Sequence, residues 1–501
     1  LYVGSLVLCS CRLFLRLRYW YELCSASHSK GANDVANAFA TSVGSGALSL
    51  RSAILIAAVM EFFGAFLLGG NVATTITKNI TNAELYSDKP EVLMLGMMCV
   101  VLGVAMWLIL ATIYSLPVST THSCIGGMVG MAVVSLGWGA GTWVEVLKVV
   151  ASWVISPVLS GVISTLVFWV VRKFILRSKE PLKRSFQSYP IIVAVTIALN
   201  LFLVLYKSES LNIQLPAWMT GLICIGEGLV VGIILQFTFI PYVKRKINRE
   251  KEKEAAELAV KETQVEVEMV STTESIPVQV EVKPEEKKEV KPEEKKETMA
   301  DHFKEHQNIH AELEDEKSKV YQMHKNAEVF DPSTEKMFTY LQIITAVFNS
   351  FAHGANDVAN AIGPFAACVS IYQTGNATGD ATVNPATLVL GGVGIVVGLA
   401  CLGYKVMAAI GVNMVKVTPS RGFSIEIGSA LVIIFGSTLG LPLSTTHCKV
   451  GSTVGVGLVE GKNGVNWSLL YGVFAGWIIT LFVCAISTGL IFAFAIYSPK
   501  L

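Results

Sequence analysis

The sequence predicts an all-α polytopic membrane protein with about twelve transmembrane segments, arranged as two inverted-topology repeats that contain broken or re-entrant helices. Three observations predict this fold. Of the 501 residues, 52% are hydrophobic and only 15% are charged. Of the 39 Lys and Arg and the 38 Asp and Glu, 18 and 24 fall between Lys244 and Lys336, which leaves the rest of the chain depleted in charge. One eight-residue motif, GANDVANA, occurs twice.

The apolar runs set the expected number of spans. A helix needs roughly 20 apolar residues to cross a bilayer. Runs of that kind cover residues 52–77, 92–115, 143–172, 190–207, 216–242, 338–366, 386–410 and 467–497. Shorter or glycine-rich candidates lie near residues 31–50, 118–137, 425–441 and 442–459.

A charged segment divides these spans into two groups. It contains a tandem octad, VKPEEKKE, and sequence so rich in Lys, Glu and Pro cannot bury a core. We therefore expect a cytoplasmic linker that is disordered or only transiently helical. The predicted domains are an irregular N-terminus at 1–30 that we interpret as truncated or unreliable, a first membrane repeat with extra helices at 31–242, the linker at 243–337, and a second membrane repeat at 338–501.

Basic residues beside the spans predict the orientation, because cytoplasmic loops are enriched in Lys and Arg. One basic cluster opens the linker at 244–249 and another lies at 172–184, with two spans between them, so both can face the cytoplasm. The loops that carry the Asn-x-Thr sequons of Asn79 and Asn376 then lie outside. In this count the first GANDVANA segment runs from outside to inside and the second from inside to outside, which makes an inverted repeat.

Two motifs recur at matched spacing. GANDVANA stands at 31–38 and again at 354–361, and PVSTTHS at 117–123 is echoed by PLSTTHC at 442–448. Asp34 precedes the first serine of its STTH element by 85 residues, and the equivalent offset in the second half is 87. Inverted duplicates with a binding site between them, near the bilayer midplane, are a recurring plan of secondary transporters.

The GANDVANA copies place carboxylate and amide groups inside apolar segments. An ionised group there is costly and usually has a partner or an ion. Hard oxygen ligands of this kind, joined by backbone carbonyls where Gly31 or Gly354 breaks a helix, suit a small cation such as sodium. The alternative is an amide network that only packs helices. The candidate cation-coupling residues are Asn33, Asp34, Asn37, Asn356, Asp357 and Asn360, with sodium at Asp34 and Asp357.

The STTH elements supply complementary chemistry for an anion. Pro117 and Pro442 can start a helix and so present unpaired N–H groups at its positive end. Six hydroxyls beside these ends could form a phosphate cradle without a fixed positive charge, although such hydroxyls can also bond back to their own helices. The candidate phosphate-binding residues are Ser119, Thr120, Thr121, Ser444, Thr445 and Thr446.

Other ionisable residues lie in or near the same segments. His122 and His447 close the two triplets, and helix packing is favoured for them over proton coupling. Lys449 could attract an anion, but Cys124 stands at the matching position of the first motif.

Three acidic residues inside apolar runs are candidates for transport, since an intramembrane carboxylate usually has a function. They are Glu61, Glu426 and, with an alternative role at a helix end, Glu227.

These motifs resemble the inorganic phosphate transporter (PiT) family of sodium–phosphate symporters. The resemblance covers both membrane halves, about 31–242 and 338–497, and excludes the linker. It implies sodium-coupled uptake of monovalent or divalent phosphate by alternating access in a homodimer, with the hydroxyl triplets contacting phosphate. The residues that match the family's essential carboxylates are Asp34, Asp357, Glu61 and Glu426.

The first half departs from this family pattern just before Gly31. The stretch LCSASHSK stands where a long apolar helix is expected, whereas the second half keeps such a run in ITAVFNSFAHGANDVANA. We interpret the first stretch as a faulty gene model rather than as a lost helix. The predicted cation site therefore rests mainly on the second GANDVANA copy, at 354–361.

The sequence is compatible with several functions other than sodium–phosphate symport. Proton coupling or another oxyanion such as sulfate stays open, because hydroxyls and helix ends do not select phosphate uniquely, and the linker would suit a non-transporting phosphate sensor or receptor. A hydrolase using Ser119 or Ser444 is disfavoured, because its base would need a third orienting group. We expect no enzyme activity, no cofactor and no nucleic acid. The expected partners are phosphate, sodium ions as co-substrate, the lipid bilayer and a second copy of the chain, and the sequons favour the plasma membrane over an organellar one.

Overall fold

The computed structural model describes most of the two predicted membrane halves. The described ranges are 31–64, 83–139, 143–206, 215–253, 308–377, 385–438 and 443–498, together with the single residues Ser29 and Ala256. Within them every regular element is a helix, and the described residues form no strand. The chain divides into two units, residues 230–307 and all the remaining residues. The larger unit contains every element discussed below except the C-terminal part of α8 and its continuation to Lys253.

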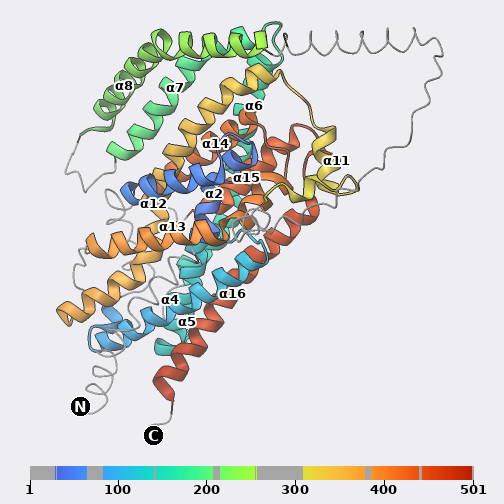
Figure 1. Cartoon of the computed structure of the whole chain (residues 1–501). Coiled ribbons are helices and arrows are strands. Elements are labelled where there is room, and N and C mark those ends of the chain that lie inside the picture. Colours follow the sequence, from blue (N-terminus) through green and yellow to red (C-terminus); the bar gives the residue numbers. More distant parts are fainter. Residues whose placement is uncertain are drawn as a thin grey trace, which may run out of the picture. The chain divides into compact units, whose positions relative to one another are not determined.

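Figure 1 shows the helices in their order along the chain. The first half contains η1 (Gly31–Val35), α2 (Ala36–Gly44), a helix at 50–64, η2 (Ala83–Tyr86), α4 (Pro90–Ile113), α5 (Thr120–Leu136), α6 (Trp143–Val171), η3 (Arg172–Leu176), α7 (Pro181–Tyr206) and α8 (Ala217–Phe237). The second contains η4 (Ala311–Leu313), α11 (Lys319–Asn326), α12 (Pro332–Thr374), α13 (Pro385–Ala408), η5 (Ala409–Asn413), α14 (Pro419–Thr438), α15 (Thr445–Leu458), η6 (Lys462–Gly464) and α16 (Trp467–Tyr497).

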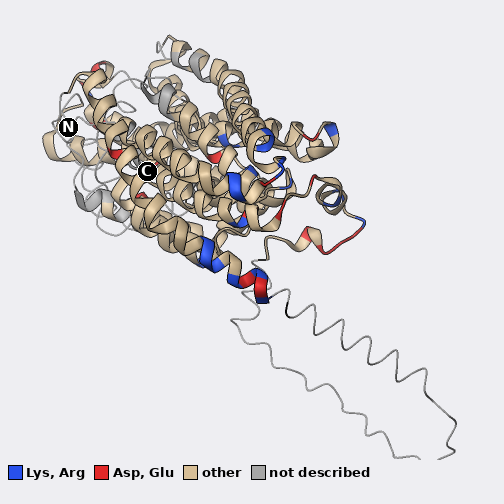
Figure 2. Cartoon of the chain, turned by 90° about the horizontal axis from the view of Figure 1, so that it is seen from above, with Lys and Arg blue, Asp and Glu red and all other residues tan. Residues whose placement is uncertain are grey.

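Six helical stretches in the described ranges are long and apolar enough to cross a membrane. They are Pro90–Ile113, Val150–Leu176, Pro181–Phe202, Ala217–Lys253, Gly391–Asn413 and Trp467–Tyr497. The multi-pass membrane protein expected from the sequence is therefore confirmed at this coarser level. Figure 2 shows long stretches of helix without a charged residue. Exposed apolar side chains such as Leu147, Val158 and Phe482 cover outward faces, as hydrocarbon solvent requires.

The two STTH elements form the same local structure. Ser119 caps α5 with a side-chain oxygen that accepts a hydrogen bond from the backbone N–H of His122 at 3.2 Å. Ser444 caps α15 in the same way, with the N–H of His447 at 3.4 Å. Each short helix therefore starts at the residue after its serine. A serine cap satisfies one of the N–H groups that a helix start leaves unpaired.

The packing of α5 and α15 is also repeated. Gly126 and Gly130 of α5 lie against the backbone of α16, and Gly451 and Gly455 of α15 lie against the backbone of α6. The spacing is that of a GxxxG contact, in which missing side chains let two backbones approach. In both halves the glycines stand 7 and 11 residues after the capping serine. In Figure 1, α4, α5 and α16 accordingly lie side by side.

The second GANDVANA copy differs from the expectation that its glycine breaks a helix. Gly354 lies inside the unbroken 43-residue α12, whereas Gly31 opens the π-helical η1. The reason for glycine at position 354 is close approach, because a Cβ there would lie 2.3 Å from the backbone oxygen of Glu61. Asn376, in the loop that follows α12, is exposed, whereas Asn79 lies outside the described residues.

The C-terminal end of the predicted linker is folded in the structure. Ile309, Val320 and Met323 are buried in the core cluster that includes Val412 and Met414. A ring nitrogen of His324 lies 2.9 Å from the backbone oxygen of Val412. Residues 308–337 thus form η4, α11 and the start of α12 against the membrane unit, because they contain more apolar side chains than the octad repeat, which has one valine in eight residues.

Ion pairs fix this segment between the two halves of the chain. Glu328 contacts Arg172 and lies 2.7 Å from Nε of Arg177. Partial burial opposes ionisation of Glu328, but the two guanidinium groups outweigh it and lower the pKa of this carboxyl. Arg421 is buried, donates to the backbone oxygen of Glu328 at 2.9 Å, and pairs with Glu460.

Arg421→Lys should destabilise this junction by about 2 kcal/mol, because an ammonium cannot reproduce the fork of guanidinium hydrogen bonds. The guanidinium carbon also lies over the rings of Phe330 and Phe168, at 5.1 and 5.7 Å. Thermal unfolding of the purified protein in detergent measures the loss. The exposed Arg184→Lys is the matched control, and an equal shift in both variants would contradict the assignment.

Candidate functional site

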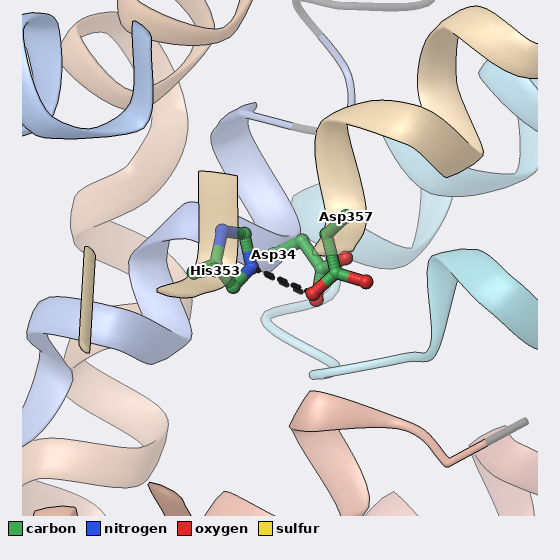
Figure 3. A group of neighbouring side chains, drawn as sticks. All are labelled: Asp34, His353 and Asp357. Carbon is green, nitrogen blue, oxygen red and sulfur yellow. Dashed lines mark ion pairs between the residues drawn. The ribbon is translucent and has the colours of Figure 1, made fainter. Parts of the chain in front are cut away.

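The two signature aspartates meet at the centre of the larger unit. Asp34 comes from η1 and Asp357 from the middle of α12, and Figure 3 shows their carboxyl groups close together with the His353 ring beside them. One ligand atom from each of the three residues lies within 4.8 Å of the others. All three side chains are buried. The structure thus brings together two carboxylates that are 323 positions apart in the chain.

Asp34 receives hydrogen bonds from both halves of the protein. Thr120 of α5 donates to its Oδ2, and Thr446 of α15 donates to its Oδ1 at 3.1 Å. The amide of Asn37 donates to the same Oδ1 at 3.2 Å and to the Thr446 hydroxyl at 2.8 Å. The Asp34 carboxylate is therefore held by the helix that follows it and by both hydroxyl helices.

Asp357 has a matching hydroxyl contact from its own half. Thr445 donates to its Oδ2 at 2.7 Å, as Thr120 does to Asp34. In the repeat, Thr120 and Thr445 are equivalent, since each directly follows a capping serine. The first threonine of each hydroxyl triplet therefore binds the aspartate of the same half.

His353 was not selected from the sequence, yet it links three carboxylates. Its Nδ1 lies 3.0 Å from Oε2 of Glu61, and its Nε2 lies 3.0 Å from Oδ2 of Asp357 and 3.9 Å from Oδ1 of Asp34. One imidazole ring thus lies at ion-pair distance from Glu61 of the first half and from Asp357 of the second. A signal was present, because an ionisable residue in an apolar run directly precedes Gly354.

Asn33 has a structural role in this arrangement. Its amide donates to the Thr112 hydroxyl at 3.0 Å and to the backbone oxygen of Leu116 at 2.9 Å, and its oxygen accepts from the N–H of Val118 at 3.0 Å. Asn33 thereby holds the loop that leads into α5. The side chains of Asn356 and Asn360 lie outside the described residues.

The starts of α5 and α15 touch each other. The Thr446 hydroxyl lies 3.2 Å from the backbone oxygen of Val118, and the rings of His122 and His447 are 4.7 Å apart. His447 also stacks on Trp477 at 3.8 Å, so both histidines sit in an aromatic cluster, as the packing interpretation predicts. The two helix starts, each with a partial positive charge, thus converge next to the aspartates.

The remaining phosphate candidates lie in the same two helix starts. Ser119 and Ser444 act as caps through their side-chain oxygens. Thr121 is buried in the first turn of α5. All six hydroxyl residues therefore lie within the two adjoining helix starts, and three of their hydroxyls already donate to the aspartates.

The two intramembrane glutamates occupy different places. Glu61 contacts α12 through His353 and through the Ser350 hydroxyl, which donates to it at 3.1 Å. Glu426 of α14 is caged by four donors. These donors are Thr41 at 2.7 Å, Ser42 at 2.6 Å, Gln342 at 3.2 Å and Thr345. Each glutamate thus contacts a signature helix of the opposite half. Glu227 falls in α8, at a point in the sequence with no repeat partner.

A cavity adjoins the aspartate cluster. It is a small, partly open space that extends from the aspartate cluster between four helices. Its polar walls come from α2, α12, α14 and α15. The polar lining residues are Asn37, Asn349, His353, Ser429, Thr445 and Lys449.

The fold and this site define a multi-pass membrane protein with a polar, charged centre built from two duplicated halves, which is the arrangement of a secondary transporter. The model of the phosphate transporter family matches residues 30–488. The chain belongs to this family.

Individual relatives agree with that assignment. The chain is 30% identical to sodium-dependent phosphate transporter 2 of Homo sapiens, over 92% of this chain and 94% of the relative. It is 34% identical to the chloroplastic inorganic phosphate transporter 2-1 of Arabidopsis thaliana, over 90% of this chain and 67% of the relative. A solved structure described as the sodium-dependent phosphate transporter superposes with a TM-score of 0.72 at 30% identity, covering 96% of this chain and 98% of that one.

Proposed function

We propose that this protein binds sodium at Asp34 and Asp357 and phosphate beside them, at the adjoining starts of α5 and α15. The protein is a transporter that imports inorganic phosphate together with sodium, and it is not an enzyme. Sodium is a co-substrate rather than a bound cofactor. One centre must therefore bind both a cation and an anion.

One observation carries the assignment of the site. The carboxylate of Asp34 accepts hydrogen bonds from the hydroxyls of Thr120 in the first half and Thr446 in the second. Oxygen ligands and carboxylates suit sodium, and the helix starts that carry these hydroxyls suit an oxyanion. A sodium ion between the aspartates would cancel the charge that otherwise repels phosphate. Binding of the anion would then depend on the cation.

The repeat packing supports alternating access through two inverted repeats. The glycine contacts of α5 on α16 recur as those of α15 on α6, with the same spacing from the capping serines. We infer that the shorter helices complete a set of about twelve spans, and that one repeat rocks against the other around the aspartates. The proposed cytoplasmic linker connects the two repeats.

The membrane and the oligomeric state are further proposals. The exposed apolar faces of α6 and α16 suit contact with lipid and with a second copy of the chain. The exposed Asn376 sequon favours the plasma membrane, and the chloroplastic relative makes an organellar membrane the competing placement.

Uptake of radiolabelled phosphate tests the coupling. Cells that express the chain should accumulate phosphate in sodium medium and lose this uptake when choline replaces sodium, at each of several pH values. Cells without the chain provide the background. Uptake that depends on pH but not on sodium would indicate proton coupling instead of sodium coupling. Inhibition of phosphate uptake by an equimolar concentration of sulfate would indicate that phosphate is not the specific substrate.

A further inference from the structure

Lys449 is a buried lysine that the proposed site has not used. It lies on α15, one helical turn after Thr445, and its side chain is 3% exposed. Residues four apart share one face of a helix, so Lys449 lies on the face of α15 that carries Thr445. The wall of the cavity beside the aspartates includes Lys449, Thr445 and His353.

The ammonium group of Lys449 has few partners. It has three N–H donors, and its hydrogen-bond contact is the Thr41 hydroxyl at 3.5 Å, the outer limit of such a bond. Within the described ranges, no carboxylate oxygen lies within 4.0 Å of its Nζ. A buried ammonium with so little compensation is costly, and in a membrane protein it usually marks a functional position.

The nearest candidate counter-ion is already occupied by other donors. Glu426 accepts hydrogen bonds from Thr41, Ser42, Gln342 and Thr345. Thr41 donates its hydroxyl proton to Glu426 and can accept from Lys449, so it lies between the two charged groups. This relay holds Lys449 in place without consuming its three donors. Donors remain available for an anion in the cavity.

The negative charges near the cavity explain why a positive side chain at Lys449 would favour anion binding. The central cluster holds Asp34, Asp357 and Glu61, with His353 as the partner within reach. Such a cluster attracts cations and repels phosphate. A fixed positive charge on the cavity wall would let the anion bind next to the sodium ions, and a phosphate oxygen is a strong acceptor for an ammonium donor.

We propose that Lys449 is a phosphate-binding residue whose ammonium group holds an oxygen of the transported anion against the start of α15. This inference rests on the proposed phosphate site. It makes the site asymmetric, because Cys124 occupies the equivalent position on α5. The anion is therefore held on the second-half side of the cavity, and the first half contributes hydroxyls and the helix start.

The test is the phosphate KM of Lys449→Met, which keeps most of the length of the side chain and removes its charge. We expect the phosphate KM to rise about 10- to 100-fold, as for loss of a charge-assisted hydrogen bond, with the sodium dependence unchanged and surface labelling equal to the wild type. Lys449→Arg should restore most of the affinity. Lys405→Met removes a lysine from α13, away from the cavity, and should leave the phosphate KM unchanged.

The outcomes separate this inference from the proposed function. A wild-type chain without sodium-dependent phosphate uptake defeats the function itself. Wild-type uptake combined with an unchanged phosphate KM in Lys449→Met defeats the inference alone, as does a lower maximal rate at unchanged KM. If Lys449→Met does not reach the surface, the phosphate KM values of Lys449→Gln and Lys449→Arg are compared instead. A phosphate KM raised at least about tenfold in Lys449→Gln but not in Lys449→Arg supports the contact. Equal phosphate KM values in the two variants overturn it.

Discussion

Asp357→Asn abolishes sodium-dependent phosphate uptake while the protein still reaches the membrane. Asparagine has the same shape and can keep the hydrogen bond from Thr445, which donates to Oδ2 at 2.7 Å. It lacks the negative charge that binds the cation and pairs with His353 at 3.0 Å. We expect uptake to fall at least about 100-fold, equivalent to about 2.7 kcal/mol. Radiolabelled phosphate uptake, normalised to surface-labelled protein, measures the loss.

The matched control removes a carboxylate charge far from the site. Glu180→Gln breaks an exposed pair with Lys183 and should leave uptake unchanged, since such surface pairs contribute little. Normal transport by Asp357→Asn would refute the cation-site assignment. Loss of surface protein in that variant would show a folding role, and Asp34→Asn would then be measured in the same way.

His353→Leu should destabilise the protein more than any other single change at the centre. It removes the group that lies 3.0 Å from Glu61 and 3.0 Å from Asp357. Buried charges left without a partner typically cost about 3–5 kcal/mol. We expect a loss of that size in detergent unfolding, together with loss of uptake. High sodium should recover part of the stability, because a cation can replace the imidazole beside the carboxylates.

His447→Leu provides the comparison for this variant. His447 is equally buried, but its contacts are the ring of Trp477 at 3.8 Å and that of His122 at 4.7 Å. An aromatic contact is worth about 0.5–1.5 kcal/mol beyond its buried area, so this loss should be smaller and insensitive to sodium. If His447→Leu costs as much as His353→Leu, or if sodium stabilises both equally, the central role of His353 is wrong.

Much of the site was predictable because its residues belong to short sequence motifs. A carboxylate in an apolar segment stands out in sequence, and its duplication in a second apolar segment makes chance an implausible explanation. The repeat at Asp34 and Asp357 identified both central carboxylates, and the serine and threonine triplets identified the helix starts beside them. The capping role of Ser119 and Ser444 is also local, because it involves residues three positions apart.

Other features could not be predicted, because they depend on contacts between distant segments. The glycine of the second motif was expected to break a helix, but Gly354 lets the backbone of Glu61 approach an unbroken one. Residues 308–337 were placed in a solvated linker, but Ile309 and Val320 dock on the core. A single apolar residue in a charged stretch says little until the surface that buries it is known.

The sequence by itself determined the class of protein, the duplicated motifs and the residue types at its centre, since hydropathy and motif identity are properties of the linear chain. Only the tertiary structure decided which carboxylates share a site. Asp34 and Thr446 are 412 positions apart, and His353 has no counterpart in the first motif, where Lys30 precedes the glycine. Their meeting follows from packing one repeat against the other, which buries their charges together and gives each a partner that its own segment does not supply.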